Sequence, residues 1–114
     1  MTTLATLDLS SPGLGSQPVV LRRATRTDVP AIVALLADDD LGATRDGIRD
    51  PSDLATYQQA FGVIDRDPAQ LWAVAEADGR VVATLQLSFI PGLSRRGALR
   101  AQIESVRVAA PTKA

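Results

Sequence analysis

Residues 71–89 read LWAVAEADGRVVATLQLSF, and this stretch decides the fold. On both sides of Asp78-Gly79 the sequence follows a period of two, which is typical of β-strands. Asp-Gly is a preferred dipeptide for a two-residue hairpin turn, because both positions adopt positive φ. The pattern predicts a strand over 71–76 and a return strand over 81–89. The return strand is expected to place these apolar residues on one face: Val81, Ala83, Leu85, Leu87 and Phe89.

Two helices are predicted upstream of this hairpin, after a short strand over 19–21. The first helix is expected to be capped by Thr27 and to end before Gly42. Its apolar residues recur at helical spacing: Val29, Ile32, Val33 and Leu36. The second helix is expected to begin at Ser52 or Asp53, after a loop, and to end at Asp67-Pro68. Its apolar face is Leu54, Tyr57, Phe61 and Ile64.

A third strand of the meander is predicted downstream. Pro91-Gly92 ends the return strand, an arginine-rich turn follows, and residues 98–108 form the next strand. The order is therefore strand, helix, helix and a three-stranded meander. This order predicts an α/β fold of the α+β type, with a mainly antiparallel sheet and two N-terminal helices.

The composition indicates one globular domain of 114 residues, with 46% hydrophobic and 22% charged residues. We expect residues 1–17 to be a flexible leader and residues 18–114 to form the domain. Neither a secretory signal nor a long apolar run is present, so we expect a cytoplasmic protein without a membrane partner. Aromatic residues are not interleaved with basic ones, so no nucleic-acid surface is expected.

The sequence contains neither cysteine nor histidine. This excludes a thiol nucleophile, a disulfide and the commonest general base, and we expect no metal site. Chemistry must therefore rest on carboxylates, hydroxyls, guanidinium groups or the backbone. After Asp78 the only acidic residue is Glu104, among six basic residues.

Residues 21–108 resemble the GNAT superfamily of acetyl-CoA-dependent N-acetyltransferases. The likeness lies in four segments taken in order: LRRAT with DVPAI near the start, the hairpin over 71–85, FIPGL at 89–93, and IESVRV at 103–108. The resemblance implies the acetyltransferase fold, with residues 98–108 as its central strand. It also implies that backbone groups of Val106, Arg107 and Val108 pair with the pantetheine arm of acetyl-CoA.

The sequence departs from the family pattern after Val108. The family continues with a glycine-rich turn, Q/R-x-x-G-x-G/A, whose amides hold the pyrophosphate at the start of a helix. Here residues 109–114 read AAPTKA and contain no glycine. The C-terminal half of the fold is therefore missing from the resemblance, and we expect acetyl-CoA binding and catalysis to be weak or absent in this chain.

Glu104 is the candidate catalytic base. The resemblance implies that an acceptor amine must lose a proton, and a carboxylate on this strand can accept it directly or through water. The amide of Val106 would then lie near the thioester carbonyl, where negative charge develops. The alternative is a structural carboxylate paired with Arg100 or Arg107.

Asp39 and Asp40 are candidate substrate-binding residues. They precede the loop between the two helices, which by the resemblance lines the acceptor pocket, and their charge would attract a cationic amine. The alternative is a solvated acidic helix end.

Arg95, Arg96 and Arg100 are expected to form an exposed basic turn, or to face the anionic cofactor or a partner.

Two classes of function remain open. The first is an N-acetyltransferase-like enzyme that transfers acetyl directly to a small-molecule or peptide amine acceptor. The second is a truncated, non-catalytic interaction module. In that case strand 98–108 would be an uncovered edge through which the chain forms a homodimer.

Overall fold

A computed structural model describes residues 7–8, 18–38 and 40–109. The predicted leader at 1–17 lies outside these residues, apart from 7–8. The elements, in chain order, are β1 (Leu7–Asp8), β2 (Val20–Arg23), the 3-10 helix η1 (Arg26–Asp28), α1 (Val29–Leu36), α2 (Asp40–Arg45), α3 (Pro51–Arg66), β3 (Gln70–Ala77), β4 (Arg80–Pro91), α4 (Ser94–Gly97) and β5 (Leu99–Val108).

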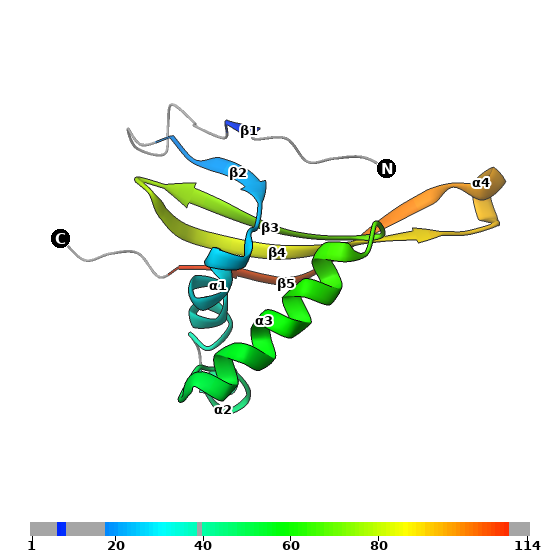
Figure 1. Ribbon diagram of the computed structural model, residues 1–114. Coiled ribbons are helices and arrows are strands. Elements are labelled where there is room, and N and C mark those ends of the chain that lie inside the picture. The colour runs from blue at the N-terminus through cyan, green and yellow to red at the C-terminus, as the bar shows by residue number, and fades with distance from the viewer. Residues whose placement is uncertain (1–6, 9–17, 39, 110–114) are drawn as a thin grey trace.

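The strands form one antiparallel sheet in the order β1-β2-β3-β4-β5, with α1, α2 and α3 on one side of it (Figure 1). The predicted α+β architecture is therefore confirmed. The structure adds α2, which the sequence did not predict, and a 3-10 turn before α1. Strand β5 is the last strand in the order of the described sheet. The central position that the resemblance implies for this strand stays a prediction.

The predicted hairpin turn is confirmed. Asp78 and Gly79 both have positive φ, at 52° and 72°, and Ala77 pairs with Arg80 across the turn. A bulge then shifts the register, so that Ala75 pairs with Ala83 but Glu76 pairs with Val81.

The bulge moves Val81 to the opposite face of β4 from Ala83. Val81 packs against the buried core beneath the helices, whereas Ala83 and Leu85 line the face without helices. The prediction that Val81, Ala83 and Leu85 share one face is therefore wrong. A strict period of two cannot anticipate an inserted residue.

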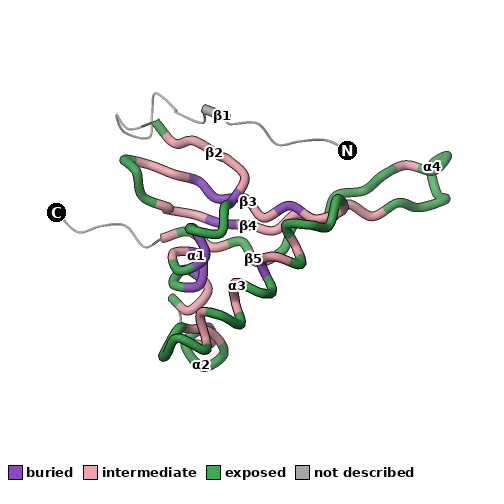
Figure 2. The backbone as a smooth tube through the Cα atoms, in the orientation of Figure 1, coloured by how far each residue is buried: buried purple, intermediate pink, exposed green. Residues whose placement is uncertain are grey.

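The core lies between the helices and β3. It is formed by Ala24, Val29, Ile32, Val33, Phe61 and Val74. Burial is concentrated there, while the tip of the β4–β5 hairpin is exposed (Figure 2). The predicted apolar faces of both helices thus point toward the sheet, as amphipathic helices require.

The helix boundaries differ from the prediction at the end of the first helix and at the start of the second. Helix α1 ends at Leu36, and Gly42 is buried inside α2 rather than ending α1. Asp50 caps α3, accepting hydrogen bonds from the N–H groups of Ser52 (2.9 Å) and Asp53 (3.1 Å). Pro51 then occupies the first helical position, where its missing N–H costs nothing. The end of α3 at Arg66 is as predicted.

Arg22 joins three elements through one guanidinium group. It donates to both carboxylate oxygens of Asp28, at 2.7 and 3.0 Å, and its Nε donates to Glu76 at 2.8 Å. The Asp28 carboxylate also accepts the Thr25 N–H at 2.7 Å. Thr25, not Thr27, therefore precedes the first helical turn. These bonds hold β2, the start of the helical segment and β3 together.

The Asp28 side chain is buried, and its hydrogen bonds with Arg22 lower its pKa below the ordinary value for aspartate. The contribution of such a carboxylate to stability is present above its unfolded pKa, near 4, and is lost as the pH falls through the folded pKa.

We predict that Asp28→Asn lowers the free energy of unfolding at pH 7 by about 2 kcal/mol, because Arg22 loses one of its two charged partners and keeps only Glu76. The variant should also show a weaker loss of stability below about pH 4 than the wild type. Urea denaturation followed by circular dichroism at pH 7 and pH 3 measures both effects.

The control is Asp65→Asn, since Asp65 and Arg23 form an exposed pair at 3.9 Å. This change should cost less than about 0.5 kcal/mol. If Asp28→Asn were as stable as Asp65→Asn at pH 7, the Arg22 network would not be a main determinant of stability.

Candidate active site

Strand β5 contains a bulge at Ser105. Glu104 pairs with Gln86 and Arg107 pairs with Thr84, so Ser105 and Val106 together oppose the single residue between Gln86 and Thr84. Ser105 has φ of 56°, in the left-handed region that non-glycine residues seldom adopt. Such a bulge bends a strand and redirects the groups that follow it.

The bulge determines which backbone groups point away from the sheet. The N–H of Ala109 donates to the carbonyl of Val82 on β4 at 2.7 Å. Because antiparallel residues alternate between facing the neighbour and facing away, Arg107 faces β4 as well. Val106 and Val108 therefore present their N–H and C=O groups at the outer edge, where no described strand pairs with them.

The side chain of Arg107 covers part of this edge. Its Nη1 donates to the Val106 carbonyl at 2.9 Å. Its Nε is buried and has no hydrogen-bond partner among the described residues. Of the three predicted residues, Val106 and Val108 therefore present their backbone groups at the outer edge. Arg107 presents its guanidinium there instead.

Glu104 lies on the face of β5 that also bears the helices, because its partner Gln86 pairs with Trp72 of the core. It is exposed, and Oε1 accepts a hydrogen bond from Gln102 at 2.6 Å. Among the described residues, neither Arg100 nor Arg107 forms an ion pair with it. The carboxylate is therefore accessible to a ligand.

A row of polar side chains that was not predicted from the sequence lies beside Glu104 on β3 and β4. Gln86 and Ser88 both donate to Gln70 Oε1 at 2.9 Å. Trp72 Nε1 donates to Thr84 Oγ1 at 2.6 Å. The signal was present in the alternation of β4, whose polar residues fall between the apolar ones at Thr84, Gln86 and Ser88.

The predicted substrate-binding residues are not brought to this site by any observed contact. Asp39 lies outside the described residues. Asp40 begins α2, and its side chain also lies outside the described part of the chain. Asp38 is exposed at the end of α1.

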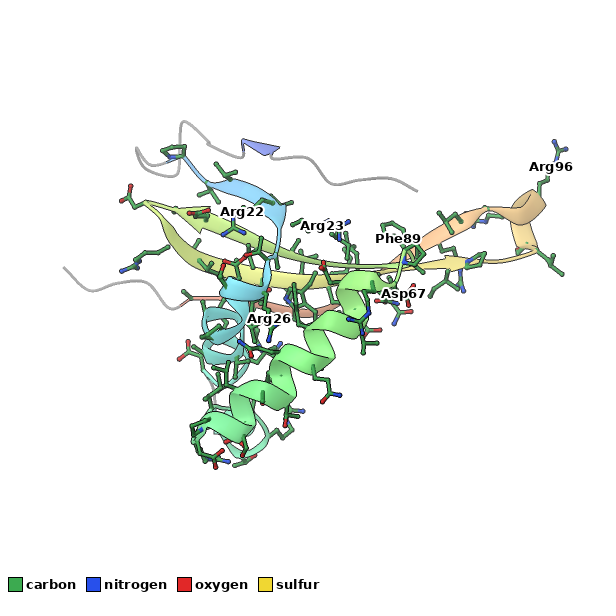
Figure 3. All side chains as sticks on the ribbon, viewed as in Figure 1. Arg22, Arg23, Arg26, Asp67, Phe89 and Arg96 are labelled. Atoms are coloured by element: carbon green, nitrogen blue, oxygen red, sulfur yellow. The ribbon has the colours of Figure 1, made fainter. Side chains whose placement is uncertain are left out.

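The arginine-rich turn forms the tip of the β4–β5 hairpin and includes the short α4. Figure 3 shows Arg96 at the far end of this hairpin, away from the body of the sheet. Arg95 and Arg96 both have positive φ, at 54° and 61°. Since Ser105 lies eight positions after Gly97 in extended chain, roughly 26 Å lies between the tip and the bulge. The tip therefore cannot contribute to a site at Glu104.

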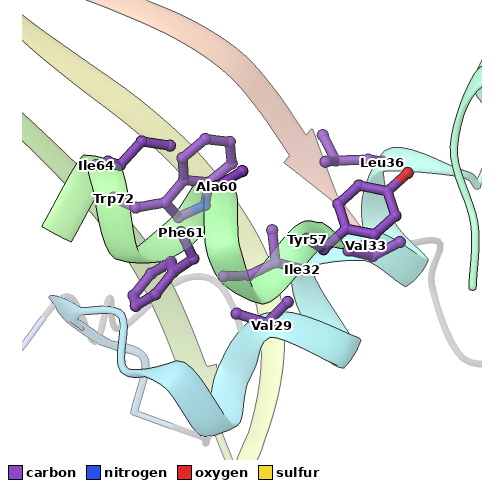
Figure 4. A pocket seen from close by; sticks show the side chains of 9 residues that line it. All are labelled: Val29, Ile32, Val33, Leu36, Tyr57, Ala60, Phe61, Ile64 and Trp72. Atoms are coloured by element: carbon purple, nitrogen blue, oxygen red, sulfur yellow. The ribbon is translucent and has the colours of Figure 1, made fainter. Parts of the chain in front are cut away.

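An apolar cavity of about 180 Å³ lies between α1, α3 and β3 (Figure 4). It is lined by Val29, Ile32, Val33, Leu36, Tyr57, Ala60, Phe61, Ile64 and Trp72. The Tyr57 hydroxyl donates to Asp46 at 2.7 Å and accepts the Gly47 N–H at 3.2 Å. Burial, together with the Asp46 bond, raises the pKa of Tyr57. Tyr57 is thus held in a structural hydrogen-bond pair, and the cavity offers no reactive group.

Two negative findings concern the described residues only. They contain no cluster of three or more acidic, histidine or cysteine side chains that could hold a metal ion. None of their helices is long and apolar enough to cross a membrane.

Comparison with known proteins matched no family model and no curated protein sequence. Solved structures do match. A transcriptional regulator from Bacillus halodurans C-125 shares 36% identity with a TM-score of 0.72, over 81% of this chain and 61% of that one. A putative acetyltransferase from Agrobacterium tumefaciens C58 shares 26% identity with a TM-score of 0.64, over 78% of this chain and 58% of that one.

A predicted acetyltransferase with acetyl-CoA from Clostridium acetobutylicum also matches, with a TM-score of 0.53. Its identity is 16%, over 79% of this chain and 59% of that one, so it supports the fold alone. The chain spans about three fifths of the length of these structures. The strand order and these similarities together confirm the resemblance found in the sequence. The chain therefore has an acetyltransferase-like fold similar to that of the GNAT superfamily.

Proposed function

We propose that β5 is the thioester-binding strand of an acetyl-CoA-dependent N-acetyltransferase, with an amine as acceptor. The observation that carries the proposal is the bulge at Ser105, which turns the backbone groups of Val106 and Val108 to the outer edge. Glu104 precedes the bulge, and Val106 follows it. The strand thus places an exposed carboxylate within two residues of a free N–H group.

These groups fit the arm of acetyl-CoA. Pantetheine carries amide groups, which need a row of peptide donors and acceptors in an extended geometry. Val106 and Val108 offer their N–H groups and the Val108 carbonyl on one edge, two residues apart, while the Val106 carbonyl already accepts a hydrogen bond from Arg107 Nη1. Both side chains are also exposed, at 51% and 71%, and supply apolar surface for the arm. Acetyl-CoA itself supplies the acetyl group as an activated thioester.

Glu104 and Val106 would each have one role in the direct transfer of the acetyl group to the amine. An amine is protonated at neutral pH and must lose a proton before its nitrogen can attack, and the Glu104 carboxylate accepts that proton directly or through a water molecule. The Val106 N–H can donate to the carbonyl oxygen as the C–N bond forms and the C–S bond breaks. The thiolate of coenzyme A then leaves and, through solvent, takes up the second proton that the nitrogen loses. A covalent acyl-enzyme is not proposed, because the chain has no cysteine and no histidine to activate a serine.

Residues 109–114 contain no glycine and do not match the glycine-rich turn that holds the phosphate end of acetyl-CoA in the GNAT superfamily. The described residues would therefore hold a ligand through its thioester arm. We accordingly propose weak binding and slow transfer for this chain.

The direct test is an NMR titration of the ¹⁵N-labelled chain with S-acetylpantetheine and, separately, with acetyl-CoA. We expect the amides of Val106 and Val108 to shift with both ligands, with dissociation constants in the millimolar range because few hydrogen bonds form. The core amide of Val74 serves as the control and should not move.

The two ligands should bind with affinities that agree within about threefold, because residues 109–114 lack the glycine-rich turn that would hold the pyrophosphate. Shifts confined to residues outside 104–108 would contradict the proposal. Acetyl-CoA binding tenfold or more tightly than S-acetylpantetheine would show that the described strand is not the main source of affinity.

Glu104→Gln should lower the rate of acetyl transfer to a primary amine at pH 7 by about 100-fold, the lower end of the effect of a general base. The rate is measured as thiol released from millimolar acetyl-CoA in the presence of the amine. Asp65→Asn is the matched control, because it makes the same chemical change on α3 and should leave the rate unchanged. Equal rates for Glu104→Gln and the wild type would exclude Glu104 from the reaction.

A non-catalytic interaction module is the second candidate function. The observation that favours it is the outer edge of β5, which is unpaired within the described sheet. Exposed edges pair readily with other strands.

A further inference from the structure

Strand β5 presents a second set of outward backbone groups, before the bulge. Because Glu104 and Ala109 lie on either side of the bulge and both face β4, the alternation places Gln102 and Arg100 toward β4 as well. Leu99, Ala101 and Ile103 then point their N–H and C=O groups outward. The bulge thus divides the edge into two parts, residues 99–104 and residues 106–108.

The part at 99–104 has the features of a strand that pairs with another strand. Its backbone groups are unpaired on the outer side within the described residues. The side chains of Leu99 and Ile103 are each 60% exposed. A long exposed edge with apolar side chains favours pairing, and the usual protective devices, proline and lysine, are absent from 99–104.

The charges on this segment select the partner. Arg100 and Glu104 lie on the same face of β5, both exposed, and neither forms an ion pair with a described residue. They are four residues apart on one strand, about 13 Å, so they cannot reach each other. In an antiparallel pair of identical strands centred on Gln102, however, Arg100 of one chain lies directly opposite Glu104 of the other.

We propose that a second copy of this chain pairs antiparallel with residues 99–104 of β5 about a two-fold axis at Gln102. The arrangement forms two cross-strand pairs between Arg100 and Glu104, since a two-fold contact repeats every interaction. It also places Ile103 opposite Ala101 on the other face. Centring the axis on Ala101 or on Ile103 would place Arg100 opposite Gln102 or Val106, respectively, and would lose both charge pairs.

This proposal does not rest on the proposed function, because the thioester arm was assigned to the other part of the edge, at Val106 and Val108. The two sites nevertheless meet at Glu104. In the dimer, Arg100 of the partner subunit lies beside the candidate base.

The test is the oligomeric state of the full chain by sedimentation velocity between 5 and 500 μM. We expect a concentration-dependent monomer–dimer equilibrium without larger species, because a two-fold contact closes on itself. Arg100→Glu and Glu104→Arg each place like charges opposite one another at both cross-strand pairs. Each variant should therefore raise the dissociation constant of the dimer at least tenfold. The double variant Arg100→Glu/Glu104→Arg restores opposite charges and should dimerise like the wild type.

Arg96→Glu is the control for net charge. It makes the same charge change as Arg100→Glu, but at the hairpin tip, and should leave dimerisation unchanged. Circular dichroism of each variant confirms that it is folded. A wild-type monomer at 500 μM, larger assemblies, or a double variant no better than the singles would overturn the proposal. Retained S-acetylpantetheine shifts in monomeric Arg100→Glu would show that the two sites are independent.

Discussion

The antiparallel hydrogen-bond ladder that starts at Asp78-Gly79 is the constraint on which the rest of the structure depends. The turn fixes how β3 pairs with β4, and this register decides which residues of β4 meet the helices. Strand β5 then takes its register from β4. Each bulge reverses the faces of the residues that follow it. The two-residue turn thus sets the β3–β4 register. The β4–β5 register in turn sets the orientation of Glu104, Val106 and Val108.

The Arg22 network fixes the other half of the fold onto this sheet. The guanidinium binds Asp28 and Glu76 at once, so the first helical turn cannot move relative to β3 without breaking a charged hydrogen bond. Arg22 pairs with Val74 across β2 and β3, and Val74 belongs to the same buried cluster as the apolar residues of α1. The ladder and the network together hold one face of the sheet against the helices and leave the outer edge of β5 unpaired among the described residues.

Much of the fold could be predicted from the sequence, because its signals are local. The Asp-Gly turn and the apolar spacing of the two long helices each lie within a few residues. Helix α2 could not be predicted, since its six residues have no apolar period and include Gly42. The caps at Thr25 and Asp50 and both bulges were also missed. The caps rest on hydrogen bonds within three residues, so their signal was local and was overlooked. The bulges depend on strand registers that sequence periodicity does not encode.

The candidate site was predictable only through the family resemblance. Glu104, Val106 and Val108 were identified in this way, and their arrangement about Ser105 came from the structure. Nothing in the local pattern distinguishes Ser105 from any other strand residue, because the bulge arises from pairing with β4. The ion pair between Arg22 and Glu76, 54 residues apart, was beyond local reasoning for the same reason.

Residue-resolved amide hydrogen exchange on β5 tests the central claim, that the bulge turns alternate backbone groups to the open edge. The account predicts slow exchange for Arg107 and Ala109, which face β4, and fast exchange for Val106 and Val108 at low protein concentration. The opposite pattern, with Val106 and Val108 protected and Arg107 exchanging freely, would contradict it.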